Sequence, residues 1–518
     1  MSRTHRQNVR RRNVLKAAAG GVLLGGAVSF AGVAKAESSK QRYVVTSNRG
    51  VVNRIENAGF EVTHSLADET VSIVVGPEDE QDALEEVNGV QEVARDFKIQ
   101  LEDTVHDVTK FETGPSVSGS AGGGSPTLWD FQWEKPRIGI PEAHDLATGA
   151  GTKIAIIDSG IQPGHPDLDN LNVDESLGFI NGEVVDEGNP FDLFGHGTMV
   201  AGIAAAQGEG VLGTAPDAEL VSIRVFDFDE EVDGFVASFV DVLLATEYAA
   251  EIGADVANLS LGTVPLPPQV NAGGIRAADE RVANRAVRDG TVVVYAAGNS
   301  ATNLQQGGWL VFSASMAGTV AVSATGSDDE LTFYSNYGTN VIDVAAPGGG
   351  MADPVESYCG YAEYIAQFDP VNEDFPDGPF KEFIEPEDRE FPEPGIDTEV
   401  CFAFPDAVFP VPVVNENFIA ECFPCTTPEY PFPLNGIIST RYIPALELYT
   451  YDWQGGTSFA APHAAGVVAL VRELEPDMNP RRVINAIKQS AEGTPGRSDS
   501  ELGAGRINAL NTVERVGG

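Results

Sequence analysis

The sequence predicts an α/β protein in which helices cover both faces of a mostly parallel central sheet, with a small α+β unit before this core. Three observations predict it. The chain has 518 residues and 42% hydrophobic content, enough for one large core and a smaller unit. From Trp129 onward, short apolar runs alternate with segments of helical spacing, which is typical of a parallel sheet. Residues 41–101 carry a separate pattern of strands and helices.

The small unit is expected to form a four-stranded sheet with two helices. Period-two alternation predicts three of its strands, and helical spacing predicts both helices. The strands are expected at Tyr43–Thr46, Glu61–Leu66 and Thr70–Val75, and the helices at Gly50–Ala58 and Glu78–Asn88. The stretch Gly114–Ser125 that follows is rich in Gly and Ser, which indicates a flexible, cleavable linker.

The core is expected to contain five short buried strands, because each is a brief apolar run. They lie at Lys153–Ile157, Ala218–Val225, Val256–Leu259, Thr291–Ala296 and Thr319–Ala324. Helices are expected between them, near His196–Ala206, Ala237–Glu251 and Ala278–Asp289. In such a sheet, functional sites form at the carboxyl ends of the strands.

The charge excludes some partners. The formal net charge is −45, from 77 acidic and 32 basic residues. Such a chain repels phosphates and anionic membrane surfaces, so a nucleic acid partner is not expected. Self-repulsion on this scale opposes folding unless dense counterions screen it, which favours a protein from a high-salt environment. An ordinary acidic secreted protein is the alternative.

Residues 1–36 are interpreted as an export signal of the twin-arginine type. Arg10, Arg11 and Arg12 precede an apolar, glycine-rich run from Ala17 to Val33, and Ala34-Lys35-Ala36 offers small residues for cleavage. The run is weakly hydrophobic and would make a poor stable membrane anchor, although an uncleaved anchor is the alternative. No other stretch has the apolar length of a membrane span.

The segment 351–435 interrupts the α/β pattern. It holds 19 acidic and two basic residues, many prolines, recurring aromatic residues and all four cysteines of the chain, Cys359, Cys401, Cys422 and Cys425. Proline at this density prevents long helices and central strands. Aromatic residues favour an ordered insertion stapled by disulfides, with unknown pairing. A mobile acidic loop, or a zinc site at the Cys422-x-x-Cys425 pair, are the alternatives.

Four short segments carry the groups that serine hydrolysis of an amide requires: a nucleophile, a base, an orienting carboxylate and an oxyanion donor. Asp158 ends a buried strand, and His196 lies between two glycines at the start of an apolar helix. Asn299 follows another apolar strand, and Ser458 opens a helix of small residues that is expected to run to Leu470. Taken singly, each of these four has an ordinary reading as a helix cap or turn residue.

Taken together and in the order Asp, His, Asn, Ser, these segments resemble the subtilisin-like serine proteases. The resemblance covers about Trp129–Gly350 and Gly436–Val513, and it implies the three-layer subtilisin-like fold. It implies that Asp158 orients His196, that His196 acts as general base and then acid, and that Ser458 attacks the peptide carbonyl. Asn299 and the Ser458 backbone N–H would hold the oxyanion. The acidic composition adds a resemblance to the halolysin-type secreted proteases of halophilic archaea.

The resemblance also implies substrate-binding residues. Ser260, Leu261 and Gly262 match the segment that pairs with the substrate main chain, and Ala296, Ala297 and Gly298 match the opposite wall of the first specificity pocket. Small residues on both walls suggest a roomy pocket and apolar or aromatic side chains before the scissile bond. No cofactor is required for the chemistry. Structural calcium is common in the family, with Asp167 and Asp130 as candidate ligands here, although Gln207–Val211 lacks the asparagine-rich loop of many relatives.

The expected organisation therefore has four parts: a signal at 1–36, an inhibitory propeptide at 37–111, a linker at 112–127 and a peptidase domain at 128–518 with the insertion at 351–435. The expected function is a secreted, self-processing serine endopeptidase that acts on protein and peptide substrates as a monomer. A catalytically silent binding protein of the same fold is the first alternative, and an esterase is the second. The esterase reading lacks the glycine-serine elbow of the common esterase fold.

Overall fold

The structure is a computed structural model, and it describes residues 40–78, 80–101, 126–185, 191–230, 232, 234–262, 274–305, 316, 318–352, 357, 434–493 and 499–518. The predicted export signal, most of the linker, all four cysteines and most of the insertion lie outside these residues. No helix in the described part of the chain combines the length and apolar character that crossing a membrane requires.

An eight-stranded sheet forms the centre of the molecule, in the order β15-β14-β13-β12-β6-β9-β7-β8. All of its pairings are parallel except the one between β7 and β8. The strands are β6 (Lys153–Asp158), β7 (Leu177–Ile180), β8 (Glu183–Val185), β9 (Glu219–Arg224), β12 (Val256–Leu259), β13 (Val292–Ala296), β14 (Val320–Thr325) and β15 (Val344–Pro347). The predicted parallel sheet is confirmed.

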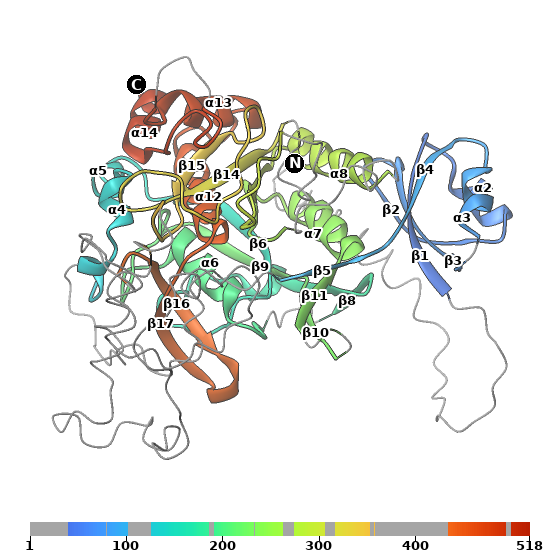
Figure 1. Cartoon of the computed structure of the whole chain (residues 1–518), viewed down its shortest axis with the longest axis horizontal. Coiled ribbons are helices and arrows are strands. Elements are labelled where there is room, and N and C mark those ends of the chain that lie inside the picture. The colour runs from blue at the N-terminus through green and yellow to red at the C-terminus, as the bar shows by residue number, and fades with distance from the viewer. Residues whose placement is uncertain are drawn as a thin grey trace, which may run out of the picture.

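Helices cover both faces of this sheet, because alternate strand residues point to opposite sides. Ile154 and Ile156 of β6 pack in the cluster of helices α6 (His196–Ala205) and α12 (Thr457–Leu474). Ala155 and Ile157 pack in the cluster of α7 (Phe239–Glu251) and α8 (Ile275–Asp289). The result is the predicted three-layer α/β core (Figure 1).

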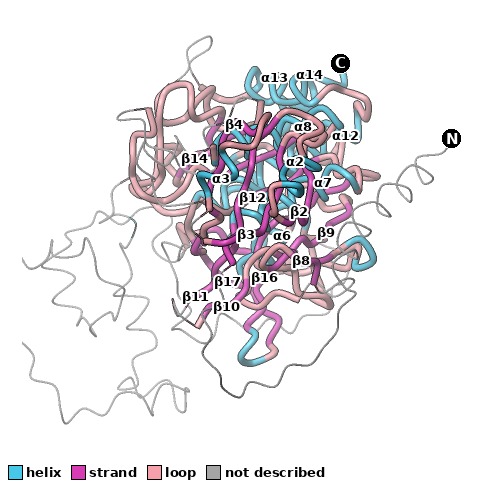
Figure 2. Tube along the Cα trace, turned by 90° about the vertical axis from the view of Figure 1, so that its right-hand side faces the viewer, coloured by secondary structure: helices cyan, strands magenta, loops and turns pink. Residues whose placement is uncertain are grey.

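Smaller elements complete the core. Short helices α4 (Glu134–Arg137) and α5 (Ile140–Ala143) precede β6, while α13 (Pro480–Ser490) and α14 (Ala509–Gly517) follow α12. Strands β16 (Ile437–Ile443) and β17 (Leu448–Gln454) form a hairpin that projects at the opposite end of the molecule from α13 and α14 (Figures 1 and 2). Just before this hairpin, the backbone N–H of Gly350 donates to the carbonyl of Asn435 over 3.0 Å, so the two ends of the intervening segment meet.

The N-terminal unit has the predicted four-stranded sheet and two helices, with strand order β2-β3-β1-β4. Its elements are β1 (Lys40–Ser47), α2 (Val52–Asn57), β2 (Glu61–Leu66), β3 (Val71–Pro77), α3 (Gln81–Glu85) and β4 (Val90–Arg95). Its own apolar core includes Tyr43, Ile55 and Leu84. The unit lies against the layer formed by α7 and α8 (Figure 1).

Several short strands were not predicted, and one of them joins the two units. Strand β5 (Lys98–Gln100) leaves the N-terminal unit and pairs antiparallel with β11 (Gly234–Ser238), which also pairs with β10 (Asp227–Asp229). Ala237, expected at the start of a helix, belongs to β11 instead. Ser238 ends that strand and caps α7 by accepting a hydrogen bond from the Asp241 N–H, a capping box that sets the true start of the helix.

Candidate active site

The carboxyl ends of neighbouring parallel strands bring four of the predicted residues to one edge of the sheet. Asp158 is the last residue of β6, and Ser260 directly follows β12. Ala296 ends β13, and Asn299 stands three residues beyond it. Because β12 lies between β6 and β13, these side chains converge as the strand pattern predicted.

Asp158 and His196 form a buried pair. Nδ1 of His196 lies 2.8 Å from Oδ1 of Asp158, and the two residues are 1% and 0% exposed. His196 begins α6, and Gly195 before it has φ +96°, a left-handed conformation that favours glycine. A β-carbon at Gly195 would lie 2.3 Å from the Tyr442 carbonyl oxygen, so glycine also lets the hairpin approach. These features hold the His196 ring beside the Asp158 carboxylate.

Ser458 lies in the first turn of α12 and is partly exposed. Its Oγ is 3.2 Å from the Ser260 carbonyl oxygen, and the Oγ of Ser260 donates to the Ser458 carbonyl oxygen over 2.7 Å. Nε2 of His196 is buried and has no hydrogen-bond partner among the described residues. In this arrangement the Ser458 hydroxyl donates to the Ser260 carbonyl and not to His196.

Asn299 is held by its amide oxygen. Oδ1 accepts hydrogen bonds from the backbone N–H and the hydroxyl of Thr457, both over 2.9 Å. The Thr457 hydroxyl in turn accepts from the Gly298 N–H over 3.0 Å. With its oxygen engaged in this way, Asn299 presents the Nδ2 amide as the group that can donate to a ligand. Sequence reasoning did not single out Thr457, although it stands directly before Ser458.

A narrow pocket joins the predicted residues to the N-terminal unit. Ser458, Asn299 and Thr457 line it together with Ser260, Leu261, Gly262, Ala296 and Gly298. Phe226, Gln100 and Leu101 complete the lining. Ala297, predicted with them, does not line this pocket: it is buried, and its N–H donates to the Val322 carbonyl while its own carbonyl accepts from Asn336.

The carboxylate of Asp167 is buried and fully occupied by hydrogen-bond donors. Oδ1 accepts from the Glu209 N–H over 2.5 Å, and Oδ2 accepts from the N–H groups of Gly210 and Val211 over 3.0 and 3.2 Å. The Tyr451 hydroxyl donates to Oδ2 over 2.8 Å. A calcium ligand must offer lone pairs to the cation, whereas here hydrogens of the short 207–211 loop surround the carboxylate. Asp167 as the structure places it does not fit a calcium site.

Asp130, the second candidate ligand, is exposed on the short 3₁₀ helix Trp129–Phe131. Within the described ranges, no three carboxylate, histidine or cysteine side chains gather in a way that could hold a metal ion.

The three-layer α/β core, the Asp158–His196 pair and Ser458 at the start of α12 are together typical of a serine hydrolase. The model of the subtilase family matches residues 149–375 and 437–505, which together are more than half of the chain. The chain belongs to the subtilase family, and it is a serine endopeptidase.

Two relatives illustrate the similarity. Thermitase of Thermoactinomyces vulgaris is 37% identical over 226 residues, which are 43% of this chain and 72% of thermitase. The alkaline protease of Alkalihalobacillus alcalophilus is 32% identical over 334 residues, which are 63% of this chain and 77% of that protease.

Solved structures share the fold over most of the chain. The epidermin leader peptide processing serine protease of Staphylococcus aureus superposes with a TM-score of 0.63 at 21% identity and covers 92% of this chain and 99% of that chain. Fervidolysin of Fervidobacterium pennivorans superposes with a TM-score of 0.59 at 18% identity and covers 93% of this chain and 62% of that chain. At these identities the likeness concerns the fold.

Proposed function

We propose that Asp158, His196 and Ser458 are the catalytic triad of this endopeptidase and that Asn299 donates to the oxyanion. The observation that carries the proposal is the buried hydrogen bond between His196 Nδ1 and Asp158 Oδ1. Two further observations support it. Ser458 and Asn299 line one pocket, and the Asn299 oxygen is already engaged by Thr457.

The chemistry proceeds through an acyl-enzyme. Ser458 Oγ attacks the peptide carbonyl as its proton passes to His196 Nε2, and Asp158 stabilises the imidazolium that forms. Asn299 Nδ2 and the Ser458 N–H hold the negative oxygen of the tetrahedral intermediate. His196 then protonates the leaving amine, the C–N bond breaks, and a water molecule activated by His196 releases the acid product and restores Ser458.

The N-terminal unit is proposed to be the inhibitory propeptide, within 37–111. Strand β5 is an added strand on β11, with Gln100 opposite Val236, and the Leu101 N–H continues the pairing by donating to the Phe235 carbonyl over 2.9 Å. Leu101 and Gln100 then line the pocket that Ser458 lines. A substrate chain that entered by the same backbone pairing would be blocked by this segment.

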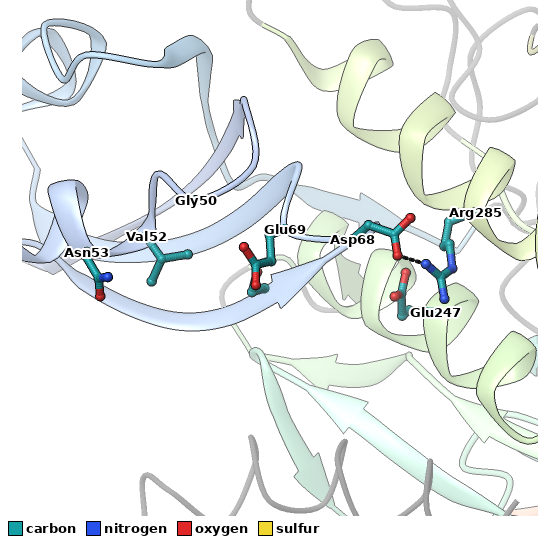
Figure 3. A pocket seen from close by; sticks show the side chains of 8 residues that line it. Gly50, Val52, Asn53, Asp68, Glu69, Glu247 and Arg285 are labelled. Atoms are coloured by element: carbon teal, nitrogen blue, oxygen red, sulfur yellow. Dashed lines mark ion pairs between the residues drawn. The ribbon is translucent and has the colours of Figure 1, made fainter. Parts of the chain in front are cut away.

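The contact with helices α7 and α8 supports the same role. Arg281 donates to the carbonyls of Ser47 and Thr70 over 3.1 and 2.8 Å, and Arg285 and Arg288 both pair with Asp68. Figure 3 shows the Asp68–Arg285 ion pair beside Glu247, at a cavity of about 550 Å³ that both units line. One face of α8 therefore holds the turn between β2 and β3.

The bound segment also supports a substrate preference. Ile99 and Leu101 are 1% and 8% exposed, and both pack in the apolar cluster that contains Phe226 and Leu261. We therefore expect protein and peptide substrates with apolar side chains upstream of the scissile bond. The proposed lining of the first subsite consists of Ser260 to Gly262 on one wall and of Ala296 and Gly298 on the other.

The remaining parts of the proposal rest on the sequence. They are export by a twin-arginine-type route, secretion, adaptation to high salt like the halolysin-type proteases, and action as a monomer without nucleic acid partners or a stable membrane anchor. The net charge of −45 supports the salt adaptation.

The decisive experiment compares the full chain with its Ser458→Ala variant by mass spectrometry after incubation in high salt. We expect loss of the region before about Trp129, with cleavage of an unfolded protein substrate, in the parent only. If Ser458→Ala processed itself and cleaved the substrate as fast as the parent, Ser458 could not be the nucleophile. Full-length, inert chains in both samples would contradict self-processing.

A further inference from the structure

We propose that Asp192, a residue outside the triad, is a positioning residue for catalysis: its buried carboxylate fixes the turn that carries His196 against the strand end that carries Asp158. The inference rests on the proposed roles of these two residues. Asp192 was not among the residues that sequence reasoning selected, because an acid in the loop before a helix usually serves as an ordinary cap.

The Asp192 carboxylate is 1% exposed and accepts five hydrogen bonds. Oδ1 accepts from the Ser159 hydroxyl over 2.8 Å and from the N–H groups of Phe194 and Gly195 over 3.0 and 2.7 Å. Oδ2 accepts from the N–H and the hydroxyl of Thr198 over 2.9 and 2.6 Å. The donors therefore lie on both sides of His196 in the sequence.

These contacts link the two halves of the Asp–His pair. Ser159 follows Asp158 directly, and its N–H donates to Asp158 Oδ1 over 2.7 Å. Its hydroxyl donates to Asp192 and also accepts from the Gly197 N–H over 2.9 Å. One continuous hydrogen-bond network therefore runs from the end of β6 to the first turn of α6, whose N–H groups have no partner within the helix.

The same turn is packed from outside by the hairpin. Arg441 of β16 places its guanidinium 5.9 Å from the Phe194 ring centre, and the Thr440 hydroxyl donates to the Thr198 carbonyl over 2.7 Å. Among the described residues, Asp158 and Arg441 are charged groups that lie beside this turn. Neither of these two residues changes in the variants below.

A second buried carboxylate gives a matched control. Asp241 is 2% exposed, lies in the first turn of α7 and accepts from the N–H groups of Asn181, Gly182 and Ser238. Like Asp192, it is a buried carboxylate that accepts backbone N–H groups at the start of a helix. None of its hydrogen-bond partners in the described part of the chain is a sequence neighbour of Asp158 or His196, whereas Ser159 and Gly195 are. A role as a structural cap alone would make the two residues equivalent for catalysis.

The test compares Asp192→Asn with Asp241→Asn in the full chain, with activity expressed per active site titrated by a sulfonyl fluoride. An asparagine would turn N–H donors toward the two donors of Thr198. We expect Asp192→Asn to lower kcat about 10- to 100-fold with nearly unchanged KM, since small displacements of reacting groups have effects of this size. The acid limb of the kcat profile should move to lower pH. Asp241→Asn should change neither quantity.

The proposal is overturned if Asp192→Asn keeps the kcat and the acid limb of the parent, whatever its thermal stability. If Asp192→Asn does not fold, Ser159→Ala decides instead, because it removes only the hydroxyl that donates to Asp192 and accepts from the Gly197 N–H. Parental kcat and pH profile in Ser159→Ala would then also overturn it. A wrong triad assignment would give another result: the Ser458→Ala chain would itself stay active.

Discussion

The amide of Asn299 is oriented by Thr457, whose N–H and hydroxyl both donate to its oxygen over 2.9 Å. We predict that Asn299→Ala lowers kcat by about 10²- to 10³-fold, the usual effect of removing one oxyanion donor. KM should change little, because the donor acts on the transition state. Steady-state kinetics on a chromogenic peptide checks this, with Asn299→Asp as the variant of equal shape that lacks the N–H groups. Unchanged kcat in both variants would exclude Asn299 from the oxyanion site.

Asp167 illustrates how protein groups can take the place of a metal ion. Burial and the neighbouring Asp167 raise the pKa of Tyr451, so its hydroxyl stays protonated and keeps donating. We predict that a calcium chelator does not lower the melting temperature of the parent chain by removing a metal ion from Asp167. Tyr451→Phe should lower the free energy of unfolding by about 2 kcal/mol, as for a hydrogen bond to a charged group. Differential scanning calorimetry decides, and a chelator effect that Asp167→Asn abolishes would restore the calcium reading.

At the scale of elements, one contact between helix α7 and the N-terminal unit depends on pH. Glu247 of α7 accepts the Ala67 N–H over 3.2 Å, and burial raises its pKa to about 7. The docked state then holds this proton more firmly than a solvated carboxylate would. The contribution of Glu247 to docking is complete at a pH below 4.5, the ordinary pKa of a glutamate. It is lost as the pH rises through about 7, the pKa of Glu247 in the docked state.

We therefore predict that the cleaved N-terminal unit dissociates from the core more readily at pH 8 than at pH 5, by about 10- to 100-fold in affinity. Size-exclusion chromatography of the processed chain at the two pH values measures the fraction that remains bound. Glu247→Gln should remove most of the difference, whereas Glu280→Gln, which changes an acid on α8 that pairs with Arg276, should leave it in place. Equal pH dependence in the parent and Glu247→Gln would contradict the assignment to Glu247.

At the scale of the whole molecule, the charge of −45 dominates. We predict that lowering KCl from about 3 M to about 0.1 M lowers the melting temperature, because less salt screens the repulsion among the acidic side chains. Sucrose is an uncharged solute that also favours the compact state, so lowering its concentration over the same range is the control. A melting temperature that is unchanged by salt would contradict the high-salt adaptation.

The sequence predicted the parts of the fold that repeat a local pattern. The strands at β6, β12 and β13 and the helices α6 and α7 were found within two residues at almost every end, because apolar periodicity sets them. Helix α8 begins three residues earlier than expected, and α12 continues to Leu474 rather than Leu470. Strand β5 was missed because its three residues form a strand only against β11, which lies far away in the sequence.

The sequence patterns also could not predict which charged residues are buried. Glu134 and Lys135 are adjacent, and hydropathy treats such a pair as surface, yet both are 0% exposed. Burial raises the pKa of Glu134 to about 7 and lowers that of Lys135 to about 8. Lys135 Nζ donates to the Ile203 carbonyl over 3.1 Å and lies 3.4 Å from Nδ1 of His463, a residue of the helix that bears Ser458. Only tertiary packing places charges there.

The backbone hydrogen bond between Gly350 and Asn435 marks a place where the chain can accept insertions of different length. A chain segment whose two ends are tied together adds length at small entropic cost, because closure entropy grows only with the logarithm of the number of residues. The sheet strand before this junction and the hairpin after it therefore need not move when the segment between them grows or shrinks. Evolution can use such a junction as an insertion point, where new surface is added to an old protease without a new core.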